Sequence, residues 1–407
     1  MTINHQQIPK KILFFPDLIN SEDSGARSAR STLKNLIDLG FEVAVFATDV
    51  EKPNNYFQYD SCKLYKIESK MSAVSHFWDI KLLQQFKKII SEFRPDFFFM
   101  AGSIQKPSIL ASFARKAGIK NIFLFYINDY YCAKTYAGLN NGPCFKCIDL
   151  GFSQALNNNC IKRDPKLINF YKSLLVMKRL QFEMKNSYKV LGYTKDQIDI
   201  YKRIGITNNK CSIINYQFDP NELNNINTKE GDYFLIIGQP ILEKGWHTLS
   251  EIITNCKSDI KIKIIFKNLE VENNIIKKYK LEKHILNGTI TTLRNITERY
   301  EIIKYIAESK GMIIPSYYPT TGEFVLLESL VLGKPVLVFN AGAHKELIIH
   351  EKNGMVAEIG DFNNFASNID RINTDSNLLK NISSNAREAA KKIFSQSNNV
   401  KLLNVFK

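Results

Sequence analysis

The sequence has 407 residues, 44% of them hydrophobic and 23% charged, which is ordinary for a soluble globular protein and long enough for two buried cores. Its net charge of +15 favours anionic partners such as phosphorylated substrates, acidic lipid headgroups or nucleic acid, although solvated lysines alone account for the same charge. Because the sequence carries no aromatic-basic nucleic-acid motif, we expect no nucleic-acid partner.

The sequence also bears on location. Residues 1–10 are polar and lack the long apolar core of a signal peptide, and no apolar run approaches the roughly 18 residues of a membrane span. We therefore expect a cytoplasmic protein, soluble or peripheral at the inner face of the membrane. In that compartment the seven cysteines would be reduced or metal-bound rather than paired as disulfides.

Short apolar runs alternate with amphipathic stretches in the first half of the chain. Continuous apolar runs predict buried parallel strands, and the stretches between them predict helices on both faces of the sheet. The expected strands lie at 12–15, 41–47, 97–101, 122–126, 188–193 and 211–215. The expected helices lie at 29–37, 82–93, 109–117 and 165–185, and Gly40, Pro95 and Gly118 stop the first three.

A polar stretch at 217–231 separates this half from a second alternation. Strands are expected at 233–237, 260–266, 311–314 and 335–339, and helices from Trp246, at 324–332 and at 378–393. The expected organisation is a domain at 1–217 with an insertion at 132–164, a linker at 218–230, a domain at 231–385 and a C-terminal helix at 386–407. The fold class is α/β, with two Rossmann-like doubly wound domains facing a cleft at the carboxyl ends of their strands.

One stretch of the second domain carries the clearest chemistry. Pro315-Ser316 ends a strand, and a loop then leads into a helix through Thr320-Thr321-Gly322-Glu323-Phe324-Val325-Leu326-Leu327-Glu328, followed by Gly333-Lys334-Pro335-Val336. The N–H groups and positive dipole end of such a helix suit a diphosphate, and Glu328 can accept two ribose hydroxyls. An ordinary helix–strand connection with surface glutamates has the same pattern.

This stretch resembles the donor-site signature of the retaining GT-B glycosyltransferases of family 4 (glycosyl transferases group 1), which runs Pro-Ser, Glu-x7-Glu and Gly-x-Pro-Val. Three further motifs resemble the family in the same order: Ser24-Gly25-Ala26-Arg27, then Gly238 with Glu243-Lys244-Gly245, then Gly342 to Glu346 with Asn353-Gly354. The resemblance covers nearly the whole chain. His344, inside the third motif, is either a sugar contact or a surface cap.

The resemblance implies a GT-B fold in which 1–217 binds the acceptor, 231–385 binds a UDP-, GDP- or TDP-sugar, and the final helix returns toward the first domain. Glu328 would hold the ribose, Lys244 would neutralise the diphosphate, and the backbone of 321–325 would cap the phosphates. Gly25 would let the first loop approach the ligand. The sugar would pass with retention to a glycan or lipid-linked acceptor in surface polysaccharide assembly, and no divalent metal would be needed.

Three positions depart from the family pattern. Thr320 stands at the first Glu of the Glu-x7-Glu pair, Gln239 stands where the family has Arg, and Asn128-Asp129 replaces the catalytic His-Asp. Glu323 can replace the missing carboxylate only if the loop is shortened, and Asn128 cannot accept a proton at neutral pH. The departures indicate either changed sugar selectivity or lost activity. A non-catalytic GT-B subunit and a sugar-nucleotide epimerase therefore stay open as alternatives.

Four cysteines form the second informative pattern. Cys132, Cys144, Cys147 and Cys160 lie in the insertion and include one C-x2-C pair. Four thiolates suit a structural zinc, which would staple a loop poor in apolar residues, and an iron–sulfur cluster uses similar ligands. Four free cysteines, two of them close by chance, are the other interpretation.

Overall fold

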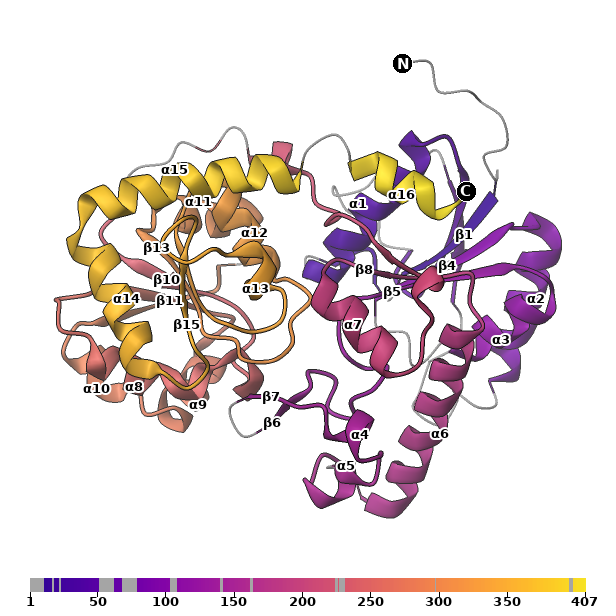
Figure 1. Cartoon of the computed structure of the whole chain (residues 1–407), viewed down its shortest axis with the longest axis horizontal. Helices are drawn as coiled ribbons and strands as arrows, with labels where there is room; N and C mark the ends of the chain where they lie inside the picture. Colours follow the sequence, from indigo (N-terminus) through magenta and orange to yellow (C-terminus); the bar gives the residue numbers. More distant parts are fainter. Residues whose placement is uncertain are drawn as a thin grey trace. The chain divides into compact units, whose positions relative to one another are not determined.

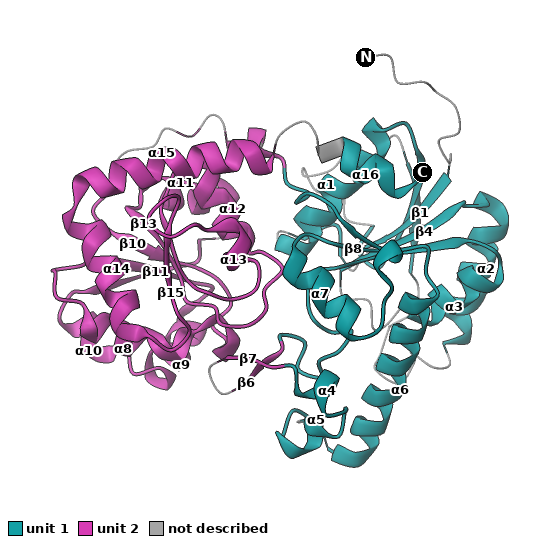
Figure 2. Cartoon of the chain, in the orientation of Figure 1, with its two compact units in different colours: residues 1–136, 145–218, 396–407 teal, residues 137–144, 219–395 magenta. Residues whose placement is uncertain are grey.

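The computed structural model describes residues 11–16, 18–21, 23–50, 62–67, 79–102, 108–139, 142–161, 164–223, 226, 231–296, 298–394 and 398–407. The chain divides into two compact units (Figures 1 and 2). Unit 1 comprises residues 1–136, 145–218 and 396–407, and unit 2 comprises residues 137–144 and 219–395. No helix in the described ranges is long and apolar enough to cross a bilayer.

Unit 1 is built on a seven-stranded parallel sheet in the order β3-β2-β1-β4-β5-β8-β9. Its central strands are almost wholly apolar, and Phe14 in β1 lies opposite both Val45 and Phe99. Burial on both faces explains why these strands are continuous apolar runs. Their bounds are β1 Lys11–Pro16, β2 Glu42–Ala47, β3 Lys63–Lys66, β4 Phe97–Gly102, β5 Lys120–Phe125, β8 Lys189–Gly192 and β9 Cys211–Ile213.

Helices cover this sheet. Their starts follow from capping side chains, because Asp23 accepts a hydrogen bond from the Ala26 N–H at 2.9 Å and Thr194 caps α7 in the same way. The helices are α1 Ser24–Asp38, α2 Ile80–Phe93, α3 Ser108–Lys116, α6 Lys166–Lys185 and α7 Lys195–Arg203. The insertion adds two short helices, α4 Lys146–Asp149 and α5 Gln154–Asn157, beside the first turns of α6 (Figure 1).

Unit 2 repeats the architecture with a six-stranded parallel sheet in the order β12-β11-β10-β13-β14-β15. The strands are β10 Phe234–Ile236, β11 Ile262–Phe266, β12 Ile290–Arg294, β13 Gly311–Ile314, β14 Val336–Phe339 and β15 Met355–Ala357. The helices are α8 Leu249–Asn255, α9 Leu269–Lys278, α10 Glu282–Leu286, α11 Arg299–Glu308, α12 Phe324–Val331, α13 His344–Leu347, α14 Phe362–Thr374 and α15 Ser376–Ile393. A small antiparallel hairpin, β6 Gly138–Leu139 with β7 Gly142–Pro143, also belongs to this unit.

The buried central strands lie within a few residues of the expected positions. The structure adds the strands β3, β12 and β15 and the helices α7, α9, α10, α11, α13 and α14, which were not among the expected elements. The units divide between Phe218 and Asp219, at the start of the expected linker, and residues 137–144 of the insertion group with unit 2. The chain rejoins unit 1 at residue 396, whereas the expected C-terminal helix begins at 386.

The end of the chain is anchored in unit 1 by one aromatic side chain. Phe406, which follows α16 (Asn398–Val405), is 3% exposed, and its ring centroid lies 4.7 Å from that of Phe41 and 5.1 Å from that of Phe97. Replacing a ring this deeply buried removes its transfer free energy and leaves a cavity.

We therefore expect Phe406→Ala to lower the free energy of unfolding of unit 1 by roughly 3–5 kcal/mol, measured by urea denaturation of the intact chain. Val400→Ala is the control, because Val400 lies on α16 but is 55% exposed. Equal effects of the two substitutions would contradict the anchoring role of Phe406.

Candidate active site

Three loops of unit 2 follow neighbouring strands of the sheet. The loop at 237–245 follows β10, the loop at 315–323 follows β13, and the segment at 340–346 follows β14. Because β10, β13 and β14 are parallel neighbours, their carboxyl ends lie on one edge of the sheet, where α/β proteins bind ligands. Most of the expected donor-site residues lie on these loops.

Two glycines let the loops approach one another. Gly245 has φ +76°, and a Cβ there would lie 1.9 Å from the carbonyl oxygen of Pro315. Gly342 has φ +49°, and a Cβ there would lie 2.3 Å from the backbone nitrogen of Thr320. The Ala343 N–H then donates to the Thr320 carbonyl oxygen at 2.9 Å. Larger residues would force the three loops apart.

Lys244 ends the 3-10 turn η3 (Leu242–Lys244) in the first of these loops. Its Nζ lies 3.7 Å from the position of a Cβ built on Gly238, so the ammonium lies beside the glycine that follows β10. The loop is joined to the next one by a hydrogen bond of 3.2 Å from the Tyr317 N–H to the Glu243 carbonyl oxygen. Lys244 thus places a cation at the carboxyl edge of the sheet.

A buried ion pair joins the second and third loops. Nε2 of His344 lies 2.9 Å from Oε2 of Glu323, and the exposed fractions of these side chains are 0% and 7%. Nδ1 of His344 lies 3.0 Å from the Phe339 carbonyl oxygen. Each ring nitrogen of His344 thus faces an acceptor, the Glu323 carboxylate at Nε2 and the Phe339 carbonyl at Nδ1. His344 is therefore neither a surface cap nor exposed, because Glu323 draws it inward.

The environment of Glu323 keeps its carboxyl ionised. Burial by itself would raise the pKa, but the interaction with His344, the Lys244 ammonium and a hydrogen bond from Ser316 together lower it from 4.5 to about 2. One carboxylate oxygen, Oε1, is buried and has no hydrogen-bond partner in the described part of the chain. An ionised oxygen with an unused acceptor site can take a hydroxyl group from a ligand.

Thr320 is connected to the same carboxylate. Its hydroxyl lies 3.1 Å from Oε2 of Glu323, and the Gly322 N–H donates to Thr320 Oγ1 at 3.1 Å. The loop therefore folds back so that a carboxylate from position 323 meets the side chain at position 320. We expect Glu323 to replace the missing Glu only if the loop is shortened, and the turn brings the side chains at 320 and 323 into contact.

Glu328 lies one turn into α12 and is 1% exposed. Its Oε1 accepts a hydrogen bond of 2.8 Å from Arg299, the first residue of α11. The sequence predicts a ribose contact for Glu328, and any such contact must coexist with or displace this ion pair. Arg299 is a partner that the sequence analysis missed, because an ion pair between two helices 29 residues apart leaves no local pattern.

The remaining expected donor-site residues surround the start of α12. Thr321 and Gly322 precede the helix, Glu323 is its N-cap residue, and Phe324 and Val325 form its first turn. The backbone N–H groups of a first helical turn have no partner inside the helix and carry the positive end of the dipole. Gln239 lies in the loop after β10, so the family's arginine position belongs to the same sheet edge.

The other expected catalytic residues belong to unit 1. Asn128 and Asp129 follow β5 and are 1% and 2% exposed. The Asn128 carbonyl oxygen accepts from the N–H groups of Tyr131 and Cys132, so this segment is a tight turn. Gly25 begins the first turn of α1, and a Cβ there would lie 3.6 Å from the Tyr126 ring. Gly25 and the Asn128–Asp129 turn thus both lie near the carboxyl end of β5.

The four cysteines of the insertion do not form the expected metal site. Within the described residues, which include all four, no three His, Cys, Asp or Glu side chains are close enough to hold a metal ion. The insertion has an apolar core of its own, in which Cys147 and Cys160 pack against Phe152, Phe170 and Met177. These two thiols thus add to the apolar packing of the insertion, and the metal stays a prediction.

The low pKa of Glu323 makes a prediction about acid stability. Because the folded-state pKa lies below the ordinary value, the stabilisation is complete above pH 4.5 and is lost as the pH falls toward 2. We expect Glu323→Gln to be less stable than wild type by roughly 3 kcal/mol at neutral pH, and we expect this difference to shrink as pH falls through that range. Urea denaturation at several pH values measures it.

Glu270→Gln is the control, because Glu270 is exposed at the start of α9 and should show no pH-dependent difference from wild type. A difference between wild type and Glu323→Gln that stays constant down to pH 2 would show that the ion pair does not hold the carboxyl ionised.

Comparison with known proteins agrees with this geometry. Residues 219–389 match the family described as glycosyl transferases group 1. Among curated proteins, a sucrose synthase of Solanum tuberosum is 34% identical over 93 residues, covering 22% of this chain and 11% of that protein. The capsular polysaccharide biosynthesis glycosyltransferase CapM of Staphylococcus aureus is 24% identical over 204 residues, covering 46% of this chain and 52% of CapM. The chain thus matches about a tenth to a half of these relatives.

Solved structures match over both units. Sucrose-phosphate synthase from Thermosynechococcus elongatus superposes with a TM-score of 0.71 at 14% identity, covering 98% of both chains. HepE from Anabaena, solved in complex with UDP, superposes with a TM-score of 0.68 at 14% identity, covering 97% of this chain and 98% of that one. The chain therefore has the GT-B fold, and residues 219–389, within unit 2, match the model of the glycosyl transferases group 1.

Proposed function

We propose that the chain is a glycosyltransferase that binds a nucleotide-sugar donor in unit 2 and transfers the sugar with retention to a glycan or lipid-linked acceptor. The observation that carries the proposal is the buried Glu323 carboxylate, held by His344 beside Thr320 with one unused oxygen. This group supplies, from position 323, the carboxylate that the family pattern has at 320. It would accept a hydroxyl of the donor sugar.

Lys244 and the first turn of α12 would hold the diphosphate. Lys244 brings a cation to the carboxyl edge of the sheet, and the helix end adds backbone N–H groups and a positive dipole end. As the bond between the anomeric carbon and the phosphate oxygen breaks, negative charge grows on the leaving nucleotide, and a fixed cation stabilises it. With Gln239 in place of the family's arginine, Lys244 carries more of this task.

In the retaining reaction the acceptor oxygen bonds to the anomeric carbon on the face from which the nucleotide leaves. The proton of the acceptor hydroxyl passes to the departing phosphate oxygen, so the charges balance without a side-chain base. This route suits Asn128, which cannot accept a proton. Asp129 would orient the turn. Glu328 would bind the ribose alongside the hydrogen bond of 2.8 Å that its Oε1 accepts from Arg299.

The names of similar proteins support the donor class and the pathway. HepE structures are solved with UDP and with UDP-glucose, and CapM is a capsular polysaccharide biosynthesis glycosyltransferase. We therefore favour a UDP-sugar as the first donor to test, ahead of GDP- and TDP-sugars. A role in surface polysaccharide assembly at the inner face of the membrane is consistent with the net charge of +15.

Donor binding can be tested by thermal shift with UDP, GDP and TDP and their common sugars. We expect one nucleotide to raise the melting temperature of wild type by mass action, and Lys244→Ala to weaken that nucleotide's binding by about tenfold or more. Lys278→Ala is the control, since Lys278 is an exposed lysine on α9. If no nucleotide stabilises wild type, the non-catalytic subunit becomes the better interpretation.

The role of Glu323 can be tested by moving the carboxylate. Glu323→Gln should reduce sugar transfer by a hundredfold or more, on the order of 3 kcal/mol, while nucleotide binding measured with UDP alone stays within a few fold. Adding Thr320→Glu to Glu323→Gly recreates the family arrangement and should recover part of the activity. Activity equal to wild type in Glu323→Gln would remove this carboxylate from the mechanism, and isomerised donor without acceptor would indicate an epimerase.

A further inference from the structure

Helix α6 of unit 1 carries an unusual outward face. Of the sixteen large hydrophobic side chains that are exposed in the described residues, five lie on this one helix. They are Leu167, Ile168, Tyr171, Leu175 and Phe182, with exposed fractions of 51% to 62%. Scattered apolar residues are normal on a protein surface, but a row of them on one helix marks an interaction site.

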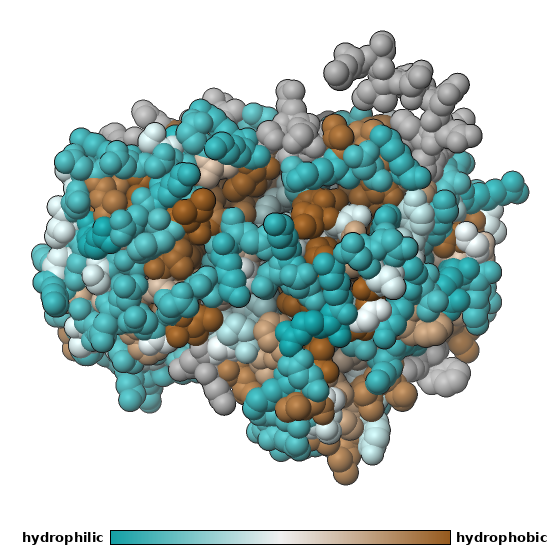
Figure 3. Space-filling model, in the orientation of Figure 1, coloured by the Kyte–Doolittle hydropathy of each residue, from teal (hydrophilic) through white to brown (hydrophobic). Residues whose placement is uncertain are grey.

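The spacing of these residues places them on a single stripe. Tyr171 follows Ile168 by three positions, Leu175 follows after four and Phe182 after seven, which is the repeat of one helical face. The opposite face is buried, because Phe170, Met177, Leu180 and Met184 lie there and are at most 8% exposed. At the end of the stripe the Arg115 guanidinium of α3 lies 5.3 Å from the Phe182 ring centroid. The stripe from Leu167 to Leu175 is not part of the buried face. Figure 3 shows hydrophobic residues on the surface of the α4–α6 region.

The charges beside the stripe have one sign. Lys166, Lys178 and Lys185 are exposed along the helix. The sole carboxylate within α6, Glu183, is 1% exposed and already paired with Arg115. A helix with an apolar stripe and a lysine border lies in the interface of an anionic bilayer, with the apolar side chains among the acyl chains and the ammonium groups at the headgroups. A second copy of this chain would bring lysines against lysines.

A cavity opens beside the stripe. It has a volume of about 460 Å³, and its lining includes Phe152, Phe170, Leu174 and Met177. Lys178 lines this cavity and also belongs to the lysine border, so the cavity reaches the same surface. An apolar cavity of this kind could hold one acyl chain, while the Lys178 ammonium at its rim contacts the phosphate of the same lipid.

We propose that the outward face of α6 is the surface by which this chain binds an anionic lipid bilayer. The inference is independent of the proposed sugar transfer, because it uses no residue of unit 2. It assigns to Leu167, Tyr171 and Leu175 the apolar part of the binding, and to Lys166 and Lys178 the part that depends on lipid charge.

The test is sedimentation of the intact chain with vesicles of phosphatidylcholine alone or mixed with phosphatidylglycerol. We expect binding to the mixed vesicles and much weaker binding to phosphatidylcholine. The triple variant Leu167→Ser, Tyr171→Ser, Leu175→Ser should lower the bilayer affinity about tenfold or more. The matched control is Leu269→Ser, Leu286→Ser, Tyr300→Ser, which removes three exposed apolar residues from unit 2.

Charge is tested separately. Lys166→Glu with Lys178→Glu should reduce affinity for the mixed vesicles by at least about 25-fold, since each lysine near an anionic surface contributes about fivefold. The control is Lys277→Glu with Lys278→Glu on α9. Circular dichroism confirms folding of all variants, and the nucleotide-induced thermal shift should be unchanged, which separates this inference from the proposed function.

Two results would overturn the inference. The first is wild-type protein that sediments with neither kind of vesicle. The second is vesicle binding that the α6 variants leave at the level of their unit 2 controls. If the α6 triple variant instead converts a dimer to a monomer in analytical ultracentrifugation without changing vesicle binding, the stripe is a contact between copies of the chain.

Discussion

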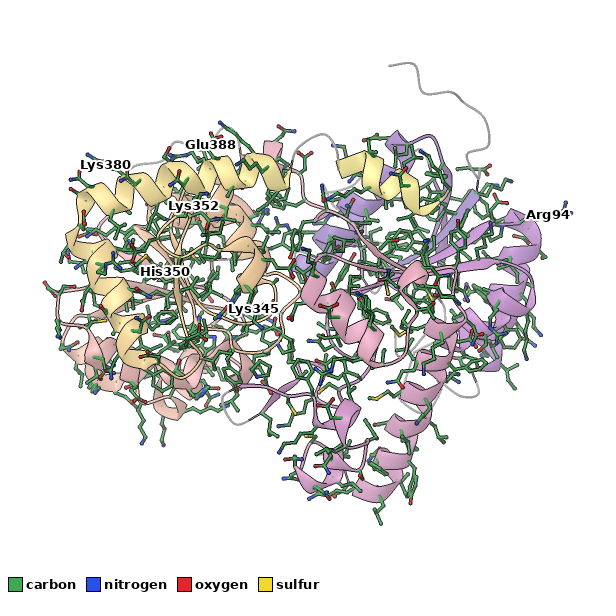
Figure 4. All side chains as sticks on the ribbon, viewed as in Figure 1. Arg94, Lys345, His350, Lys352, Lys380 and Glu388 are labelled. Carbon is green, nitrogen blue, oxygen red and sulfur yellow. The ribbon has the colours of Figure 1, made fainter. Side chains whose placement is uncertain are left out.

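The donor side of unit 2 depends on one buried ion pair. A carboxylate removed from water is stable in its charged form only with a close cation and hydrogen-bond donors, and Glu323 has His344 at 2.9 Å together with Thr320. The pair also fixes the backbone, because His344 follows Gly342, which approaches Thr320 too closely to permit a side chain. In Figure 4 the segment is found by the label of its neighbour Lys345. The close approach of the loops at 315–323 and 340–346 therefore also determines where the Glu323 carboxylate lies.

Under the proposed function, this arrangement lets a departure from the family pattern keep a carboxylate at the site. The sequence has Thr320 where the family pattern has a glutamate, so an alignment of the two sequences indicates that the carboxylate is missing. The chain instead turns at Gly322 and returns the side chain of Glu323 to the hydroxyl of Thr320. Binding of a donor sugar would depend on where the carboxylate oxygen lies in space, and not on which residue number carries it. Thr320 and Glu323 should therefore be considered as a unit.

The sequence predicts the fold well where the physical signal is continuous burial. The strands β1, β4, β5, β10, β13 and β14 are apolar over most of their length, so each stands out from its neighbours. The prediction fails at the edge strands β3, β12 and β15, although it finds the edge strand β9. The first half of β3 (Lys63–Lys66) is exposed and only the first residue of β12 is buried, because an edge strand is covered on fewer sides. The motifs that contain glycine indicated which loops lie close together. The partners of His344 and Arg299 could not be predicted, because they come from distant parts of the sequence.

In the insertion, the residue types alone do not predict how the side chains pack. Four cysteines in a short polar loop suggest a metal, yet Cys147 and Cys160 serve an apolar core with Phe152 and Phe170. The same core holds the first turns of α6, whose outer face is also apolar. A helix that is apolar on two opposite faces has a weak amphipathic signal, so the sequence shows only a helix. The outer face becomes informative once the inner face, which includes Phe170, Met177 and Leu180, is seen to be buried, because burial of one face leaves the other without a role in the core.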